Sequence, residues 1–73
     1  MQQITIMEEN ETRKRVGERL KTLRTKQNLS VRDLAEKTGI NISNISRIEN
    51  GKISPTIDVL DKLAKALGTT IKL

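Results

Sequence analysis

The sequence has no cysteine, no histidine and no phenylalanine, tyrosine or tryptophan. Without cysteine and histidine, disulfide bonds, thiolate chemistry, zinc fingers and histidine-dependent acid–base catalysis are excluded. The carboxylates are scattered along the chain, and the hydroxyl groups have no base beside them. We therefore predict no catalytic residue, no metal site and no cofactor, and we do not expect an enzyme.

Long hydrophobic runs are missing too, because no apolar stretch approaches the ~18 residues of a membrane-spanning helix. The first residues, MQQITIMEENE, include no basic segment of the kind that opens a signal peptide. We therefore expect a cytoplasmic protein with no membrane partner. A single domain of 73 residues buries only about 60% of its unfolded surface. The core must therefore be economical, which favours a compact, all-α bundle, and nine isoleucines, eight leucines and three alanines can supply it.

Positive charge is unevenly distributed along the chain. Residues 1–12 carry three acidic groups and no base, whereas residues 13–52 carry eleven basic and four acidic groups. A polyanion is the natural partner of such a basic segment. A solvated surface of lysine and arginine, which is common in small domains, explains the same charges equally well.

Patterns typical of short β-strands flank a helical middle. Residues 2–7 alternate, with Ile4 and Ile6 on one side, and residues 69–73 also favour a strand. The two segments either pair, within one chain or across a dimer, or are frayed termini. Residues 8–12 form a linker or lead into a helix that Thr12 caps. The chain thus divides into residues 1–12, a helical domain over 13–68, and a strand or tail over 69–73.

Helical periodicity predicts the first and last helices of this domain. The first covers residues 13–26 and ends at Asn28, and its apolar positions are Val16, Leu20 and Leu23. The last begins at Ser54-Pro55-Thr56, with proline where its missing N–H costs nothing, and Gly68 closes it. Its apolar stripe consists of Ile57, Leu60, Leu63, Ala64 and Leu67.

Capping residues define two short helices between them. Ser30 caps the second helix, with Asp33 as its reciprocal partner, and Gly39 supplies the left-handed residue that stops it. Asn41 caps the third helix, which runs to residues 50–51. The spacing of small and apolar residues suits two helices that cross through a short turn. Counted from Val31, these residues are Ala35 at the fifth position, Gly39 at the ninth, Ile45 at the fifteenth and Ile48 at the eighteenth.

The sequence resembles the helix-turn-helix family of phage Cro proteins and repressors, also called the XRE family. The matching blocks are RVGERLKTLR, LSVRDLAEKTGI, ISRIENGKISPT and LDKLAKALG, which together cover about residues 13–68. This resemblance implies a DNA-binding bundle of four or five helices like that of lambda repressor, with residues 41–50 as the recognition helix. Members of the family bind operator DNA as dimers, and most regulate transcription.

The third helix itself favours a DNA major groove. At 100° per residue, its polar side chains lie opposite Ile45 and Ile48. Arginine suits the O6 and N7 atoms of guanine, and asparagine suits the N6 and N7 atoms of adenine. Arg47 could instead bind a phosphate or form a surface salt bridge, and Asn44 could instead help Asn41 to cap the helix. The candidate base-contacting residues are Ile42, Ser43, Asn44 and Arg47.

Ile42 departs from the family pattern. Many members carry glutamine there and at the position of Val31, and in those proteins the two glutamines act together at the bases. Ile42 either touches a thymine methyl group or seals the core behind the turn, and we prefer the second alternative. The base preferences of glutamine-bearing relatives therefore do not transfer to this chain.

Phosphate contacts are expected around the two short helices. The N-terminus of the second helix presents backbone N–H groups to an anion, and the family resemblance implies that Asn50 also binds the DNA backbone. Asn50 could instead act only as a C-terminal cap, and Lys52 could be a solvated lysine. The candidate phosphate-contacting residues are Ser30, Arg32, Ser46, Asn50 and Lys52.

Arg24 and Glu49 have a structural role by resemblance. Glu49 lies at the edge of the buried face of the third helix, where an unpaired carboxylate is costly. In the family, the matching arginine and glutamate form an ion pair that joins the first helix to the third.

Two functions follow from these observations. The first is a prokaryotic or phage transcriptional regulator, most simply a repressor, associated with the nucleoid. It would bind a pseudo-palindromic operator in double-stranded DNA as a homodimer, with half-sites about 34 Å apart. The alternative is an antitoxin that binds a toxin protein and autoregulates its operon, because the ending LGTTIKL resembles relatives that dimerise through a strand. Single-stranded nucleic acid and double-stranded RNA are disfavoured, since stacking rings are absent and the deep RNA groove excludes a helix.

Overall fold

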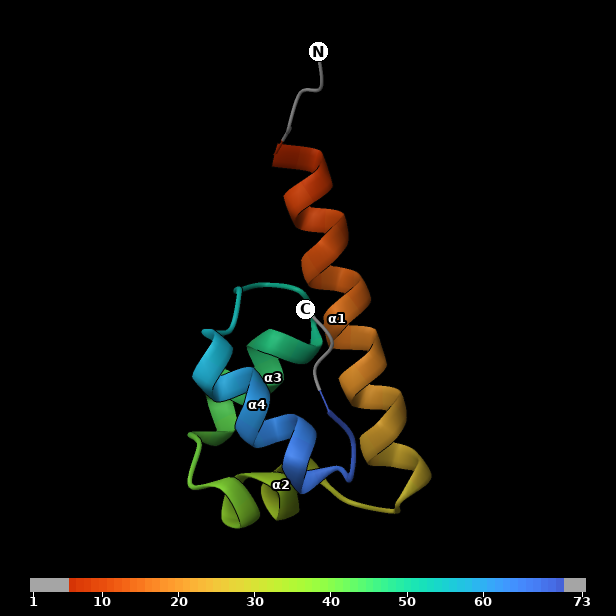
Figure 1. The fold of residues 1–73 in the computed structure, drawn as a ribbon, viewed down its shortest axis with the longest axis vertical. Coiled ribbons are helices and arrows are strands. Elements are labelled where there is room, and N and C mark those ends of the chain that lie inside the picture. The colour runs from red at the N-terminus through yellow and green to blue at the C-terminus, as the bar shows by residue number, and fades with distance from the viewer. Residues whose placement is uncertain (1–5, 71–73) are drawn as a thin grey trace.

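The structure is a computed structural model, and it describes residues 6–70. This part of the chain folds into four α-helices (Figure 1). They are α1 (Ile6–Lys26), α2 (Val31–Thr38), α3 (Ile42–Glu49) and α4 (Ile57–Ala66), and residues 6–70 contain no strand. The all-α bundle expected from the sequence is therefore confirmed.

A small aliphatic core holds the four helices together. Helix α1 packs against α3, and α2 packs against both α3 and α4. Each fully buried leucine or isoleucine stabilises the fold by about 1.5–3 kcal/mol relative to an exposed one. Every helix contributes to this core, which consists of Leu20, Leu34, Ile45, Ile48, Leu63 and Leu67.

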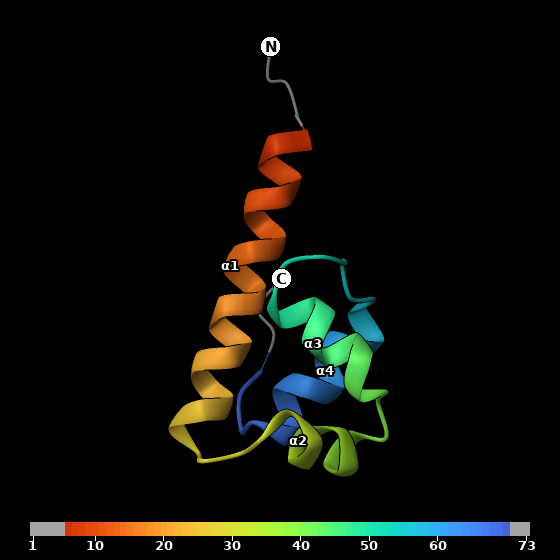
Figure 2. The ribbon, with the colours of Figure 1, turned by 180° about the vertical axis from the view of Figure 1, so that it is seen from behind.

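The two views of the ribbon place α3 and α4 on opposite faces of the body. In Figure 1 α4 lies in front of α3, and in the reverse view of Figure 2 α3 lies in front of α4. Helix α1 runs along the side of the body, and its first turns extend beyond the other three helices in both views. One face of the molecule therefore presents α3 to its surroundings.

Helix α1 begins earlier than the sequence pattern predicts. The strand expected over residues 2–7 is wrong at Ile6 and Met7, which are helical, and residues 2–5 lie outside the described part. The linker expected over residues 8–12 is also helical, and Thr12 lies inside α1 rather than at its cap. Glutamate is a good helix former and is favourable near a helix N-terminus, and this segment contains no glycine or proline. Period-two alternation of only a few residues was too weak to outweigh these local preferences.

The other expected strand is not present at Thr69 and Thr70, and residues 71–73 lie outside the described part. The backbone explains the result at Thr69, because its N–H group donates to the carbonyl of Ala64 over 2.9 Å and so closes α4. Gly68 lies in the left-handed region at φ 75°, and its N–H group donates to the carbonyl of Lys65. This pair of bonds is the Schellman motif, and it confirms Gly68 as the residue that ends the helix.

The start of α4 also differs from the expectation. Thr56 is the N-cap and its side chain accepts from the N–H of Val59, so Pro55 precedes the cap instead of occupying the first helical turn. The expected apolar stripe is wrong at Ile57, which is 63% exposed. Helical periodicity places Ile57 on the same face as Leu60, but burial also needs a neighbouring element, and none covers this side chain.

Candidate nucleic-acid interface

The turn between α2 and α3 follows the predicted capping chemistry. Ser30 and Asp33 form a reciprocal capping box, with the two hydrogen bonds at 2.9 and 2.8 Å. Gly39 ends α2 at φ 73°. This left-handed conformation is strained for any residue that has a Cβ atom, but not for glycine. Asn41 then caps α3 by accepting from the N–H of Ser43 at 2.8 Å. The two short helices are thus oriented by local bonds as well as by the core.

Helix α3 has one buried face and one exposed face. Ile45 and Ile48 are 1% and 2% exposed, and both belong to the core. The opposite face carries hydroxyl, amide and guanidinium groups that can donate and accept hydrogen bonds. Its exposed residues are Ser43, Asn44, Ser46, Arg47 and Asn50. Helix α3 itself lies in front of α4 in Figure 2.

Arg47 and Asn44 are hydrogen-bonded to each other on this exposed face. Nη1 of Arg47 donates to Oδ1 of Asn44 over 3.2 Å. The cap of α3 comes from Asn41, so the alternative in which Asn44 completes the capping network is not observed. Among the side chains of residues 11–70, Arg47 forms no salt bridge with a carboxylate, so a surface ion pair is not observed for it there. No carboxylate in that part of the chain therefore neutralises the positive charge of the Arg47 guanidinium.

Ile42 lies at the first position of α3 and is 42% exposed. The preferred alternative from the sequence, that Ile42 seals the core behind the turn, is therefore wrong. Ile42 therefore exposes a branched apolar side chain next to the polar residue Ser43 at the start of α3. Val31, at the other position where relatives carry glutamine, is partly buried and packs against the core.

The C-terminal end of α3 is closed by backbone bonds. Gly51 has φ 70° and donates to the carbonyl of Ile48, while the N–H of Lys52 donates to the carbonyl of Arg47 over 2.8 Å. The side-chain amide of Asn50 donates to the carbonyl of Ser46 over 2.9 Å, so Asn50 does cap this helix. The Lys52 side chain is exposed next to this end, where it can meet an anion.

The N-terminal end of α2 is less favourable to an anion than the sequence suggests. The N–H of Ser30 is already bonded to the carboxylate of Asp33. Backbone and side-chain hydrogen bonds from Ser30 lower the pKa of Asp33, a carboxylate that is already negatively charged at neutral pH. A phosphate approaching here meets that charge, which the cation of Lys37 partly offsets, and Arg32 is an exposed cation in the same turn of α2.

The expected ion pair between Arg24 and Glu49 is formed. Nε of Arg24 lies 2.7 Å from Oε2 of Glu49, and Nη2 lies 2.9 Å from Oε1, which makes the pair bidentate. Nη1 of Arg24 also donates to the carbonyl of Leu29 over 2.7 Å. The hydrogen bond to Glu49 raises the pKa of Arg24 above its ordinary value, although burial acts in the opposite direction. Both residues are buried, so this pair fixes α1 against the C-terminal end of α3.

Gly17 is a further positioning residue that the sequence reasoning missed. It is buried, and a Cβ at this position would overlap the carbonyl oxygen of Ile48 and lie 2.6 Å from that of Glu49. The backbones of α1 and α3 therefore approach closely at this point. A glycine inside an otherwise helical pattern was the available signal, because it often marks such a contact.

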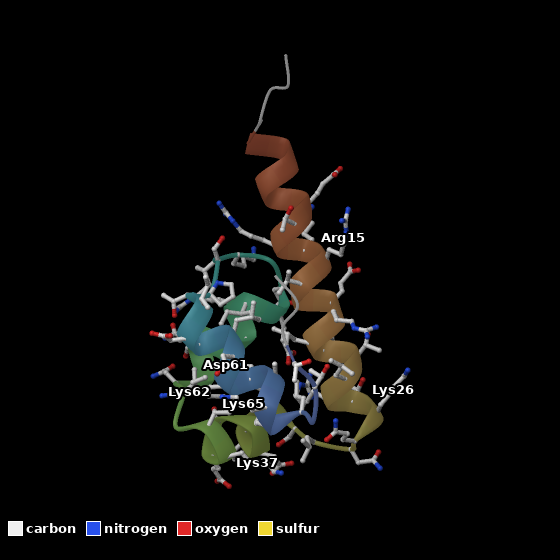
Figure 3. The ribbon with its side chains drawn as sticks, in the orientation of Figure 1. Arg15, Lys26, Lys37, Asp61, Lys62 and Lys65 are labelled. Carbon is white, nitrogen blue, oxygen red and sulfur yellow. The ribbon has the colours of Figure 1, made fainter. Side chains whose placement is uncertain are left out.

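Basic residues also occur away from α3. Figure 3 shows Lys62 and Lys65 on α4, on the face opposite α3, and Arg15 and Lys26 along α1. Lys65 pairs with Asp61 over 2.9 Å within α4. Positive charge therefore also occurs on α1 and α4, and the polar side chains of α3, rather than charge alone, distinguish the candidate interface.

Comparison with known proteins decides the family. A profile of the helix-turn-helix family HTH_3 matches residues 20–73, about three quarters of the chain. The chain belongs to the HTH_3 family of helix-turn-helix proteins. The XRE-type resemblance stated from the sequence is thereby confirmed.

Relatives of this HTH_3 chain are named as transcriptional regulators and repressors. It is 46% identical over 55 residues to the HTH-type transcriptional regulator PuuR of Escherichia coli, covering 75% of this chain and 30% of PuuR. It is 46% identical over 52 residues to the HTH-type transcriptional repressor RghR of Bacillus subtilis, covering 70% of this chain and 38% of RghR. The chain thus spans about a third of the length of these two relatives.

A solved structure has the same fold. An HTH_3 family transcriptional regulator from Vibrio cholerae superposes with a TM-score of 0.80 at 32% identity, covering 85% of this chain and 35% of that protein. The comparisons support the prediction that this domain is not an enzyme, because the HTH_3 relatives are described as regulators. None of the helices within residues 6–70 is long and apolar enough to cross a membrane.

Proposed function

We propose that the chain is a sequence-specific, double-stranded DNA-binding transcriptional regulator that inserts α3 into the major groove. The observation that carries this proposal is the exposed polar face of α3, which is held by a buried apolar face of the same helix. Its mixture of hydrogen-bond donors and acceptors suits the edges of base pairs. Membership in the HTH_3 family supports the same conclusion.

Base contacts are assigned to four residues of α3. Arg47 has the guanidinium geometry that pairs with guanine, and Ile42 offers an apolar surface to a thymine methyl group. Ser43 and Asn44 are exposed between them. Each good bidentate contact discriminates against the wrong base by about 1–3 kcal/mol.

Phosphate contacts are assigned to the edges of the same surface. Lys52 lies just beyond the C-terminal end of α3 and Arg32 in the first turn of α2, and both cations are exposed. Hydroxyl and amide groups of Ser30, Ser46 and Asn50 are exposed nearby as weaker candidates. Phosphate contacts set position and affinity, whereas the groups on α3 set sequence preference.

A homodimer on a pseudo-palindromic operator is the assembly that we propose. A two-fold dimer presents two copies of α3, and its operator carries two half-sites about one helical turn, roughly 34 Å, apart. Repression is the simplest mode, and one relative, RghR, is named as a repressor. Such a protein would act in the cytoplasm, in association with the nucleoid.

Selection from a random pool tests this function. Duplexes that bind the protein at moderate salt are recovered over several rounds and sequenced. We expect enrichment of a pseudo-palindrome whose half-site spacing reports the dimer geometry. Binding without enrichment of any sequence would contradict the proposal.

The antitoxin alternative rests on a strand over residues 69–73. Thr69 and Thr70 are not in a strand, and the remaining residues lie outside the described part, so no described contact favours this alternative. Co-purification with the product of a neighbouring gene would be required to support it.

A further inference from the structure

We infer that Asn44 acts by positioning Arg47, so that the two side chains form one base-reading unit rather than two independent ones. This inference rests on the proposed function. Its central observation is the hydrogen bond from Nη1 of Arg47 to Oδ1 of Asn44, at 3.2 Å. The two residues are three positions apart on α3, a spacing that brings side chains together on one helix face.

The bond uses a donor that Arg47 can spare. A guanidinium has five N–H donors, and the bond to Asn44 occupies one of them on Nη1. The edge formed by Nε and Nη2 keeps its two parallel N–H groups for the O6 and N7 atoms of guanine. The side chain can thus be held by Asn44 and still make a bidentate base contact.

The same bond changes what Asn44 offers to DNA. An asparagine that recognises adenine accepts from N6–H with Oδ1 and donates to N7 with Nδ2. Here the position of Oδ1 is set by Arg47, so the amide is oriented toward the guanidinium. Asn44 therefore contributes to the preference for guanine opposite Arg47 and does not specify an adenine of its own.

Burial and charge support the same division of roles. Both residues are exposed, so their contact does not serve the core, which is formed by the opposite face of α3. Among the side chains of residues 11–70, Arg47 has no carboxylate partner, and its hydrogen bond on the exposed face goes to Asn44. Holding a long, rotamer-rich side chain before binding reduces the conformational entropy lost on the DNA.

The test compares base preference among four variants on the operator selected by the wild-type protein. Affinity is measured for that operator and for duplexes substituted at each half-site position, with Asn44→Ala, Asn44→Asp, Arg47→Ala and the double variant Asn44→Ala/Arg47→Ala. Thermal unfolding of each variant checks that the fold is retained. Asn44→Asp is the matched control, because aspartate still accepts from Arg47 but cannot donate to N7 of adenine.

We expect Asn44→Ala to reduce discrimination about tenfold at the position that Arg47→Ala also affects, with no loss at a second position. Asn44→Asp should keep that discrimination, although its negative charge weakens binding to all duplexes. The double variant should discriminate no worse than Arg47→Ala alone. Independent losses at two positions, which multiply in the double variant, would overturn the inference while leaving the proposed function intact. A wild-type protein without any sequence preference would overturn both.

Discussion

At position 17 there is room for a hydrogen atom and for nothing larger. The backbone carbonyls of Ile48 and Glu49 occupy the space that a methyl group would need. These carbonyls belong to the last residues of α3, so the close contact sets the distance of α1 from the candidate DNA-reading helix. The identity of this single residue therefore affects the placement of the interface.

Replacing Gly17 with alanine should destabilise the protein. In an ordinary helix interior the same change stabilises by roughly 0.5–1 kcal/mol, because alanine is the better helix former. Here overpacking against backbone should reverse the sign and cost about 1–3 kcal/mol. Urea denaturation measures the difference. Thr22→Ala, at an exposed position of α1, is the control and should be neutral or slightly stabilising. A Gly17→Ala protein more stable than wild type would contradict the close approach.

Ile42 allows a test that removes a single methyl group from the DNA. If its exposed side chain contacts a thymine, replacing that thymine with uracil should weaken binding of the wild-type protein. The burial of one methyl group is worth about 0.8 kcal/mol, or roughly fourfold in affinity. Ile42→Ala should bind the thymine and uracil duplexes equally. A wild-type protein that ignores the change at every operator thymine would remove Ile42 from the base-contacting set.

The residues of the site differ in how far the sequence determined them. The hydroxyl, amide and cationic groups of α3 were predictable, because helical periodicity places them opposite Ile45 and Ile48. The exposure of Ile42 was not predictable, because it depends on how closely the turn between α2 and α3 approaches the core. The spacing of Asn44 and Arg47 places them close enough to bond, but whether the hydrogen bond forms depends on the rotamers of both side chains.

Among the elements, the two short helices were the most predictable. Their boundaries are set by capping bonds over two or three residues, as at Ser30 and Asn41, and such local chemistry is visible in a sequence. Helix α1 lacks a comparable signal at its start, and its beginning was placed seven residues too late. The exposure of Ile57 and the role of Gly17 depend on contacts between elements, which periodicity within one helix does not report.

The ion pair between Arg24 and Glu49 joins two of these elements, and its removal should be strongly non-additive. Arg24→Met leaves Glu49 buried without its partner and should cost about 3–5 kcal/mol. The double variant Arg24→Met/Glu49→Leu removes both charges and should be more stable than Arg24→Met, although the carbonyl of Leu29 loses its donor in both. Chemical denaturation of four proteins measures this: wild type, Arg24→Met, Glu49→Leu and the double variant. A double variant as unstable as the sum of the two single variants would show that the charges are not coupled.

Lys52 lies three residues after the end of α3, and replacing it tests the proposed phosphate contact of the interface. Lys52→Ala should weaken binding to all duplexes by a similar factor, because a phosphate contact carries no base information. The slope of log affinity against log salt should become shallower by about 0.9, the value for one released counterion. Lys62→Ala on α4, on the opposite face, is the matched control and should leave the slope nearly unchanged. A loss confined to the selected operator would contradict the phosphate assignment.

On the scale of the whole molecule, the fold separates α3, the helix that we propose reads DNA, from the face formed by α4. Figures 1 and 2 show α3 and α4 on opposite sides of one small core. That arrangement allows α3 to enter a groove while α4 and α1 stay available for contacts with a second copy. Cations on both faces explain why net charge alone did not identify the binding surface in the sequence.

Residue-resolved mapping of the bound surface tests the central claim most directly. Backbone amide signals of ¹⁵N-labelled protein are followed by NMR during titration with the selected operator, and with a scrambled duplex as control. We expect the largest operator-specific shifts in α3, from Ile42 to Arg47, with smaller shifts common to both duplexes near Arg32 and Lys52. Shifts concentrated in α4, with α3 unchanged, would contradict the account.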